Sequence, residues 1–91
     1  MPKYMVERHL PGITDEQLAA AAAGAKSVTA EMSRSGTPVR YLRSTFVPGE
    51  SKCYCLFEAS SEQVVRDANE RAGIPYERVV EAKLVASEDL P

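Results

Sequence analysis

Apolar and polar residues alternate in four short stretches of the chain and repeat with a helical period in two longer ones. The alternating stretches, residues 3–9, 39–47, 52–59 and 79–85, predict strands. Residues 14–33 and 61–72 carry a period of 3.6, which predicts two helices. The resulting order, strand–helix–strand–strand–helix–strand, is that of a split βαβ pair. It predicts a ferredoxin-like α+β sandwich, in which both helices cover one face of a four-stranded antiparallel sheet with strand order 4-1-3-2.

Polar residues and one glycine mark the predicted helix ends. Thr14 and Gln17 have the spacing of a capping box, and Ser60 and Gln63 repeat it at the second helix. Gly73 stands where a left-handed cap would end the second helix. The chain therefore predicts one domain over residues 1–86, followed by a short acidic tail over residues 87–91.

Composition limits the kinds of partner and the cellular compartment that we expect for this chain. The net charge is −2 with both signs interspersed, so we expect no nucleic-acid partner, which would need a clustered basic patch. No apolar run approaches the ~18 residues that span a bilayer, and no apolar signal region opens the chain, so we expect no membrane partner and a cytoplasmic location. Cys53 and Cys55 lie two apart on one strand, where a disulfide would be strained, and are expected to be reduced.

The alternation also assigns strand side chains to the two faces of the sheet. The residues expected to meet the helices are Tyr4, Val6, Leu42, Phe46, Cys53, Cys55, Phe57, Val80, Ala82 and Leu84. Those expected on the uncovered face are Met5, Glu7, His9, Tyr41, Arg43, Thr45, Tyr54, Leu56, Glu58, Glu81 and Lys83. The uncovered face thus carries an apolar patch rimmed by polar groups, which predicts a homodimer through this face.

The uncovered face also holds the only histidine of the chain together with three carboxylates. Glu7 and His9 lie at alternate positions of one strand, within reach of one ion. Imidazole and carboxylate together suit a first-row divalent ion such as nickel, zinc or iron. We therefore predict a metal site of Glu7 and His9, with Glu58 or Glu81 as a further ligand. The alternative is a face of Glu–Arg and Glu–Lys ion pairs, with His9 a surface histidine.

Other chemistry has less support in the residues. There is no glycine-rich phosphate loop, and a single histidine excludes a His-based acid–base pair. A small-molecule enzyme of the monooxygenase or isomerase type is the runner-up, with a cavity between sheet and helices into which Tyr4, Arg8 or Ser44 would point. A plain dimerisation module is the third possibility, and the fold alone does not choose among them.

Several segments resemble a known family. They are Met1–Arg8, Leu10-Pro11-Gly12, Tyr54–Ser60, Gly73-Ile74-Pro75 and Arg78-Val79. Together they resemble a small bacterial family of domains of unknown function, typified by an actinobacterial nickel-binding protein. The resemblance implies a ferredoxin-like fold, a dimer and, for at least one member, nickel binding without known catalysis. Our first interpretation is therefore a dimeric divalent-metal-binding protein, nickel in the first place, for sequestration or sensing rather than turnover. Arg43 stands where relatives carry a histidine, and a guanidinium has no lone pair for a metal.

Overall fold

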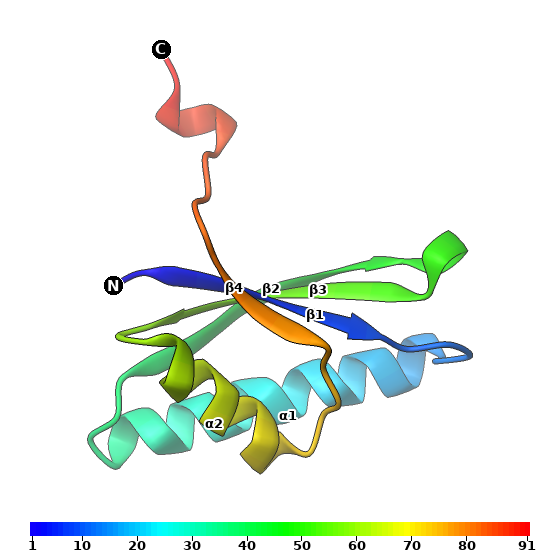
Figure 1. The fold of residues 1–91 in the computed structure, drawn as a ribbon, viewed down its shortest axis with the longest axis horizontal. Helices are drawn as coiled ribbons and strands as arrows, with labels where there is room; N and C mark the ends of the chain where they lie inside the picture. The colour runs from blue at the N-terminus through cyan, green and yellow to red at the C-terminus, as the bar shows by residue number, and fades with distance from the viewer.

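Two helices pack on one face of a four-stranded antiparallel sheet, so the predicted ferredoxin-like fold is confirmed (Figure 1). The computed structural model describes residues 1–91. The strand order is β2-β3-β1-β4, with β1 and β3 in the centre. The elements are β1 (Lys3–His9), α1 (Asp15–Arg34), β2 (Val39–Val47), β3 (Lys52–Ala59), α2 (Glu62–Ala72) and β4 (Arg78–Ala82), with single 3₁₀ turns at Pro48–Glu50 and Ser87–Asp89. No helix combines the length and apolar character that crossing a bilayer demands.

The two helices start differently. At α1 the predicted capping box is present: the Thr14 hydroxyl accepts from the amide of Gln17, whose side chain accepts from the amide of Thr14. At α2 the predicted box is wrong by one residue, since the cap is Ser61, which accepts from the Val64 amide. Two adjacent serines offer equivalent caps, and the chain uses the second of them.

The face assignment of β2 is wrong in its first half because the strand contains a bulge. The register with β3 shifts between Tyr41 and Arg43, so Leu42 is an extra residue on this strand. Tyr41 therefore lies on the helix side, where its ring packs edge-on against that of Phe57. The centroids of the two rings are 5.5 Å apart. After the bulge, Ser44 takes the helix side and Arg43 lies on the uncovered side, as its partner Leu56 does.

The face assignment of β4 is reversed. Val79, rather than Val80, lies opposite Val6 and is buried beneath the helices. Glu81 lies opposite Tyr4 and so shares the helix side, although it remains exposed at the end of this edge strand. The strand also ends at Ala82 rather than at residue 85. β4 is a short edge strand, and the burial of Val79 determines its register with β1. The apolar alternation of residues 80, 82 and 84 does not determine it.

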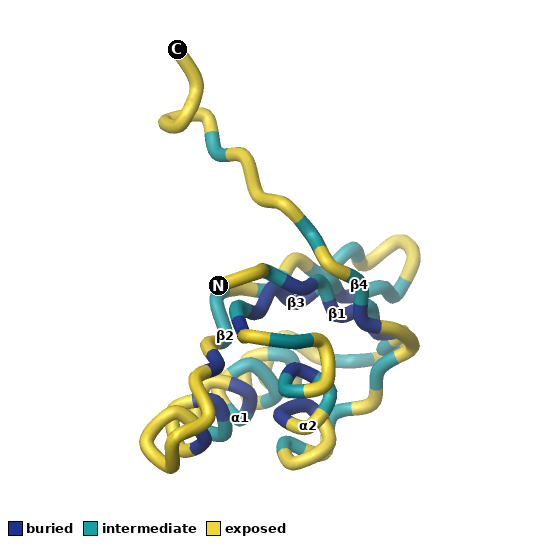
Figure 2. Tube along the Cα trace, turned by 60° about the vertical axis from the view of Figure 1, so that its left-hand side comes forward, coloured by how far each residue is buried: buried dark blue, intermediate teal, exposed yellow.

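The core lies between the central strands and the facing sides of the helices, where the buried positions gather in Figure 2. Arg8 is 2% exposed within it, although it carries a charge. Its Nη2 donates to Asn69 Oδ1 of α2 at 2.5 Å, and its Nη1 donates to the carbonyl of Pro75 at 3.4 Å. Its Nε donates to the sulfur of Cys55 on β3 at 3.3 Å. One side chain of β1 thus holds β3, α2 and the segment that leads to β4.

After β4 the chain leaves the domain as an arm, residues 83–91. In both views it projects from the sheet on the side away from the helices (Figures 1 and 2). Its residues are exposed almost throughout, and the 3₁₀ turn Ser87–Asp89 lies two residues before its end. Gly73, with φ of 70°, ends α2 in the left-handed conformation predicted for it, which aims the following segment at the sheet edge.

We predict that Arg8→Ala lowers the free energy of unfolding by about 2–4 kcal/mol. The change leaves the buried side-chain oxygen of Asn69 without the donor that Arg8 supplies, and it opens a space where the side chain was packed. Urea unfolding of the variant and the parent measures the loss. Arg71→Ala is the matched control, because Arg71 is exposed and should change stability by less than about 0.5 kcal/mol. Equal stability of the two variants would contradict the role given to Arg8.

Candidate functional site

The open face, meaning the side of the sheet opposite the helices, carries Glu7 and His9 together. Both belong to β1 and alternate with the buried Val6 and Arg8, so they point to the same side. His9 is exposed and lies opposite Lys52 of β3. Glu7 is half-buried, with Tyr54 opposite it on β3 and Arg78 opposite it on β4. Alternate positions of a strand are ~6.5–7 Å apart, which lets both side chains reach one ion.

Glu7 already has a cationic partner. Arg78 Nε donates to its Oε2, and the two form an ion pair. This hydrogen bond holds the pKa of Glu7 below its usual value of 4.5, with the charges of Arg78 and Lys52 adding to the effect against partial desolvation. The carboxylate is therefore ionised at neutral pH and presents oxygen lone pairs, but a metal ion would have to share or displace Arg78.

The other two predicted ligands lie elsewhere. Glu58 is on the open face but opposite Lys3, four residues along β1 from Glu7, which is ~13 Å. It pairs there with Lys3 at 3.5 Å and with Arg40 at 3.4 Å. Glu81 is on the helix side, so its predicted place beside Glu7 is wrong. Within one chain, no three His, Cys, Asp or Glu side chains form a group that could hold a metal ion.

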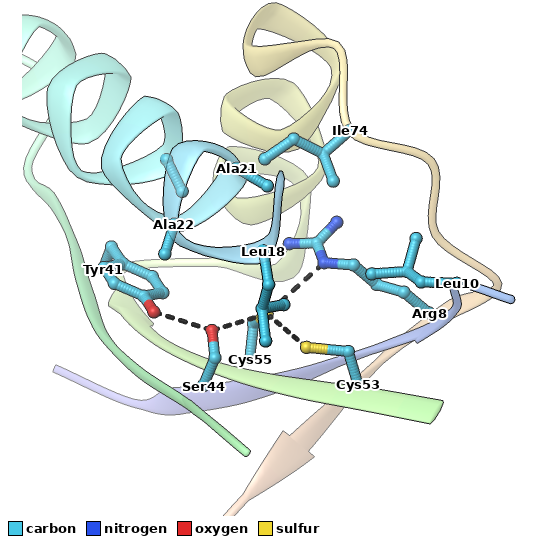
Figure 3. Close-up of a pocket in the computed structure, with 11 residues that line it drawn as sticks. Arg8, Leu10, Leu18, Ala21, Ala22, Tyr41, Ser44, Cys53, Cys55 and Ile74 are labelled. Carbon is cyan, nitrogen blue, oxygen red and sulfur yellow. Dashed lines mark hydrogen bonds between the residues drawn. The ribbon is translucent and has the colours of Figure 1, made fainter. Parts of the chain in front are cut away.

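A second feature is a small cavity between α1 and the sheet (Figure 3). Its volume is about 10 Å³, which is room for about one water molecule. Arg8 and Ser44 line it, as the enzyme alternative expected, whereas Tyr4 is buried in the core outside it. The space in this structure is too small for an organic substrate.

The polar groups of this cavity are bonded to one another. The Tyr41 hydroxyl is 2.6 Å from that of Ser44, which is 3.0 Å from the sulfur of Cys55. The sulfurs of Cys55 and Cys53 are 3.7 Å apart, and both residues are free, buried cysteines. Burial, followed by the proximity of Cys55, raises the pKa of Cys53 to about 11, so Cys53 is a thiol at neutral pH.

Comparison with known proteins adds to this geometry. The model of a family described as nickel responsive protein SCO4226-like matches residues 4–82. The chain belongs to this family. The crystal structure of SCO4226 from Streptomyces coelicolor A3(2) is similar, with a TM-score of 0.78 and 27% identity. That similarity covers 92% of this chain and 99% of the other. No curated protein matches the chain significantly.

Membership of the SCO4226-like family agrees with the resemblance expected from the sequence and links the chain to nickel in the name of the family. The matched segment takes in Glu7, His9 and all of the sheet except Lys3, and it stops at Ala82, directly before the arm. The arm therefore lies outside what the family model describes.

Sequence reasoning missed the buried polar residues Asn69 and Thr29. Asn69 directly follows Ala68 on the side of α2 that faces the core. A polar residue on the apolar side of a predicted helix was the feature of the sequence that could have indicated a buried hydrogen bond. Its amide donates to the carbonyl of Val65 at 2.8 Å, which leaves its oxygen free to accept from Arg8. Thr29 accepts from the amide of Tyr41, next to the bulge in β2.

The ion pair of Glu7 predicts a dependence of stability on pH. Because the folded pKa of Glu7 lies below 4.5, the fold gains stability from the ionised carboxylate above that pH. The gain should fade as the pH falls below 4.5 through the lowered value. Glu7→Gln should therefore be less stable than the parent at pH 7, with the difference shrinking at pH 3 and in high salt.

Urea unfolding at both pH values tests this prediction. Glu31→Gln is the control, since Glu31 is an exposed carboxylate of α1 outside the ion pairs of the structure. A difference between parent and Glu7→Gln that stays constant from pH 7 to pH 3 would show that the Arg78 contact does not stabilise the fold.

The two cysteines should react only after unfolding, because Cys53 is 0% and Cys55 5% exposed. A colorimetric thiol assay should find two thiols in urea and none reacting rapidly in the folded protein. Ser35→Cys, at the exposed end of α1, is the positive control and should add one rapidly reacting thiol. Rapid reaction of both native thiols would argue against their burial.

Proposed function

We propose that this chain binds a divalent metal ion, nickel in the first place, through Glu7 and His9 on the open face of a homodimer. The observation that carries the proposal is that these two side chains share one face of β1 in a member of a nickel responsive family. Neutral imidazole and carboxylate are ligands that first-row divalent ions accept, and nickel ranks high among those ions for such donors.

Two protein ligands leave most of the coordination shell to be supplied. Glu58 is too far along the sheet to join Glu7 and His9 in the same chain. A two-fold axis that passes beside these two residues would bring a second Glu7 and His9 pair to the first, since a two-fold interface presents the same patch twice. Waters complete the shell where the second copy does not, so the site depends on the homodimer for strength.

The role that fits such a site is sequestration or sensing. One histidine per chain with oxygen ligands gives modest affinity, and the bound ion would compete with Arg78 for Glu7. A site of this kind responds to the concentration of free metal rather than retaining it permanently. Two buried free thiols suit a reducing compartment, so we place this role in the cytoplasm.

Calorimetric titration with nickel tests the proposal. His9→Ala should weaken binding about ten-fold or more, a loss of ~1.4 kcal/mol, because it removes the only imidazole. Acidification of the parent should also weaken binding, since imidazole coordinates only as the neutral base. Ser27→Ala is the control, because Ser27 is exposed on α1, on the other side of the sheet, and takes part in no side-chain hydrogen bond. No binding by the parent, or equal binding by His9→Ala, would reject the site.

The same titration on Arg78→Ala tests the competition for Glu7. Removing the cation frees the carboxylate and takes away a positive charge, so nickel should bind up to about five-fold more tightly. A weaker binding constant in Arg78→Ala would mean that the arginine helps to assemble the site instead of competing for it.

A further inference from the structure

The arm, residues 83–91, exposes apolar side chains that the domain does not cover. Leu84 is 43%, Val85 67% and Leu90 59% exposed, and of the other large apolar side chains only Met1 is comparably exposed. Single exposed leucines are ordinary, but three on one protruding segment of nine residues form a contact surface without an occupant. The arm stands on the open side of the sheet, where a second copy would lie (Figures 1 and 2).

The open face has a hollow of about 100 Å³ that suits one such side chain. Met5 and Leu56 form its apolar part, and Leu56 is 4% exposed even though it faces away from the helices. Arg43 and Lys83 stand at the hollow, and neither takes part in an ion pair. Thr45 and Tyr54 add hydroxyl groups to its wall. The hollow is therefore apolar inside and positively charged at its rim.

The charges of the arm and the open face are complementary. The arm carries Glu88 and Asp89 immediately before Leu90. The strands of the open face carry five cations against two carboxylates, and both carboxylates are already paired within the chain. The cations are Lys3, Arg40, Arg43, Lys52 and Arg78, and the carboxylates are Glu7 and Glu58. Lys3 and Arg40 pair with Glu58, Lys52 with Glu77 and Arg78 with Glu7, so an acidic segment is attracted most strongly at Arg43, which is the one of the five without an ion-pair partner.

The arm is also long enough. Six extended residues and one 3₁₀ turn span up to ~26 Å, whereas the outer strands of a four-stranded sheet are ~14 Å apart. The arm starts at the hollow, since Ala82, Lys83 and Leu84 form part of its wall, and then runs away from its own sheet. A second copy laid on the open face meets this arm, and two-fold symmetry makes the exchange mutual.

We infer that the arm of each chain docks in the open-face hollow of a second copy, with Leu90 in the hollow and Glu88 and Asp89 at Arg43. The inference rests on the homodimer of the proposed function and names the segment that closes it. In this arrangement the arm of one copy places its two carboxylates against the cations on the open face of the other copy. The arm lies outside the segment, residues 4–82, that the family model matches.

Sedimentation equilibrium of the full chain tests the contact. Leu90→Asp should raise the dimer dissociation constant roughly ten- to hundred-fold, since it replaces a buried leucine by a charge. Arg43→Glu and the double variant Glu88→Lys with Asp89→Lys should each weaken the dimer as well. Arg71→Glu is the matched control, because it makes the same charge change on α2, away from the open face, and should leave the constant unchanged.

Mixing Arg43→Glu with the double variant Glu88→Lys and Asp89→Lys distinguishes two arrangements. In one the arm docks on the second copy, and in the other it folds back on its own sheet. In a mixed dimer the lysines of one arm meet the carboxylate that Arg43→Glu introduces, and the other arm keeps the original contact. The mixed dimer should therefore form more tightly than either variant alone, whereas an arm folded on its own sheet gives no such gain. A dimeric parent with no preference for the mixed pair, or with Leu90→Asp equally dimeric, would overturn the inference. A monomeric parent would instead reject the homodimer of the proposed function.

Discussion

The arrangement of this small domain depends on the hydrogen bonds of one buried group, the guanidinium of Arg8. A cation in the core loses its hydration, and this chain compensates with an amide oxygen, a carbonyl and a sulfur from three different segments. No carboxylate forms an ion pair with Arg8, so these hydrogen bonds alone must compensate for the hydration that the cation has lost. They are satisfied only when α2 and the segment after it lie over the end of β1. The buried cation thereby selects one placement of the second half of the fold.

This arrangement separates structure from function across the two faces of the sheet. The helix side is filled by the core and by the bonded set of Arg8, Cys55, Ser44 and Tyr41, leaving room for about one water molecule. The open side keeps its charged groups at or near the surface, where they exchange partners at little cost. Glu7 and His9 are on that side because they alternate with Val6 and Arg8. The positions that build the core thus determine which side chains remain available to a ligand.

The open face has an excess of cations, which at first sight disfavours a metal ion. Arg78 illustrates the balance, since it keeps Glu7 ionised and at the same time occupies it. In the homodimer proposed above, carboxylates from the arm of the second chain would draw the cations outward while the ligands of that chain approach the ion. Metal binding and association would then be coupled, and each would strengthen the other in the same free-energy cycle. Such coupling suits a protein of a nickel responsive family, in which the state of the chain should follow the amount of metal.

The sequence by itself determined the element order, the sheet topology and the shared side of Glu7 and His9. These follow from local rules: periodicity identifies each element, Thr14 with Gln17 starts α1, and Gly73 ends α2. Tertiary structure decided what depends on pairing between distant segments. The bulge at Leu42 turned Tyr41 inward, and pairing of Val79 with Val6 moved Glu81 away from Glu7. A strand's register is fixed by the neighbour it bonds to, and one residue of shift exchanges the two faces, so local alternation does not reveal it.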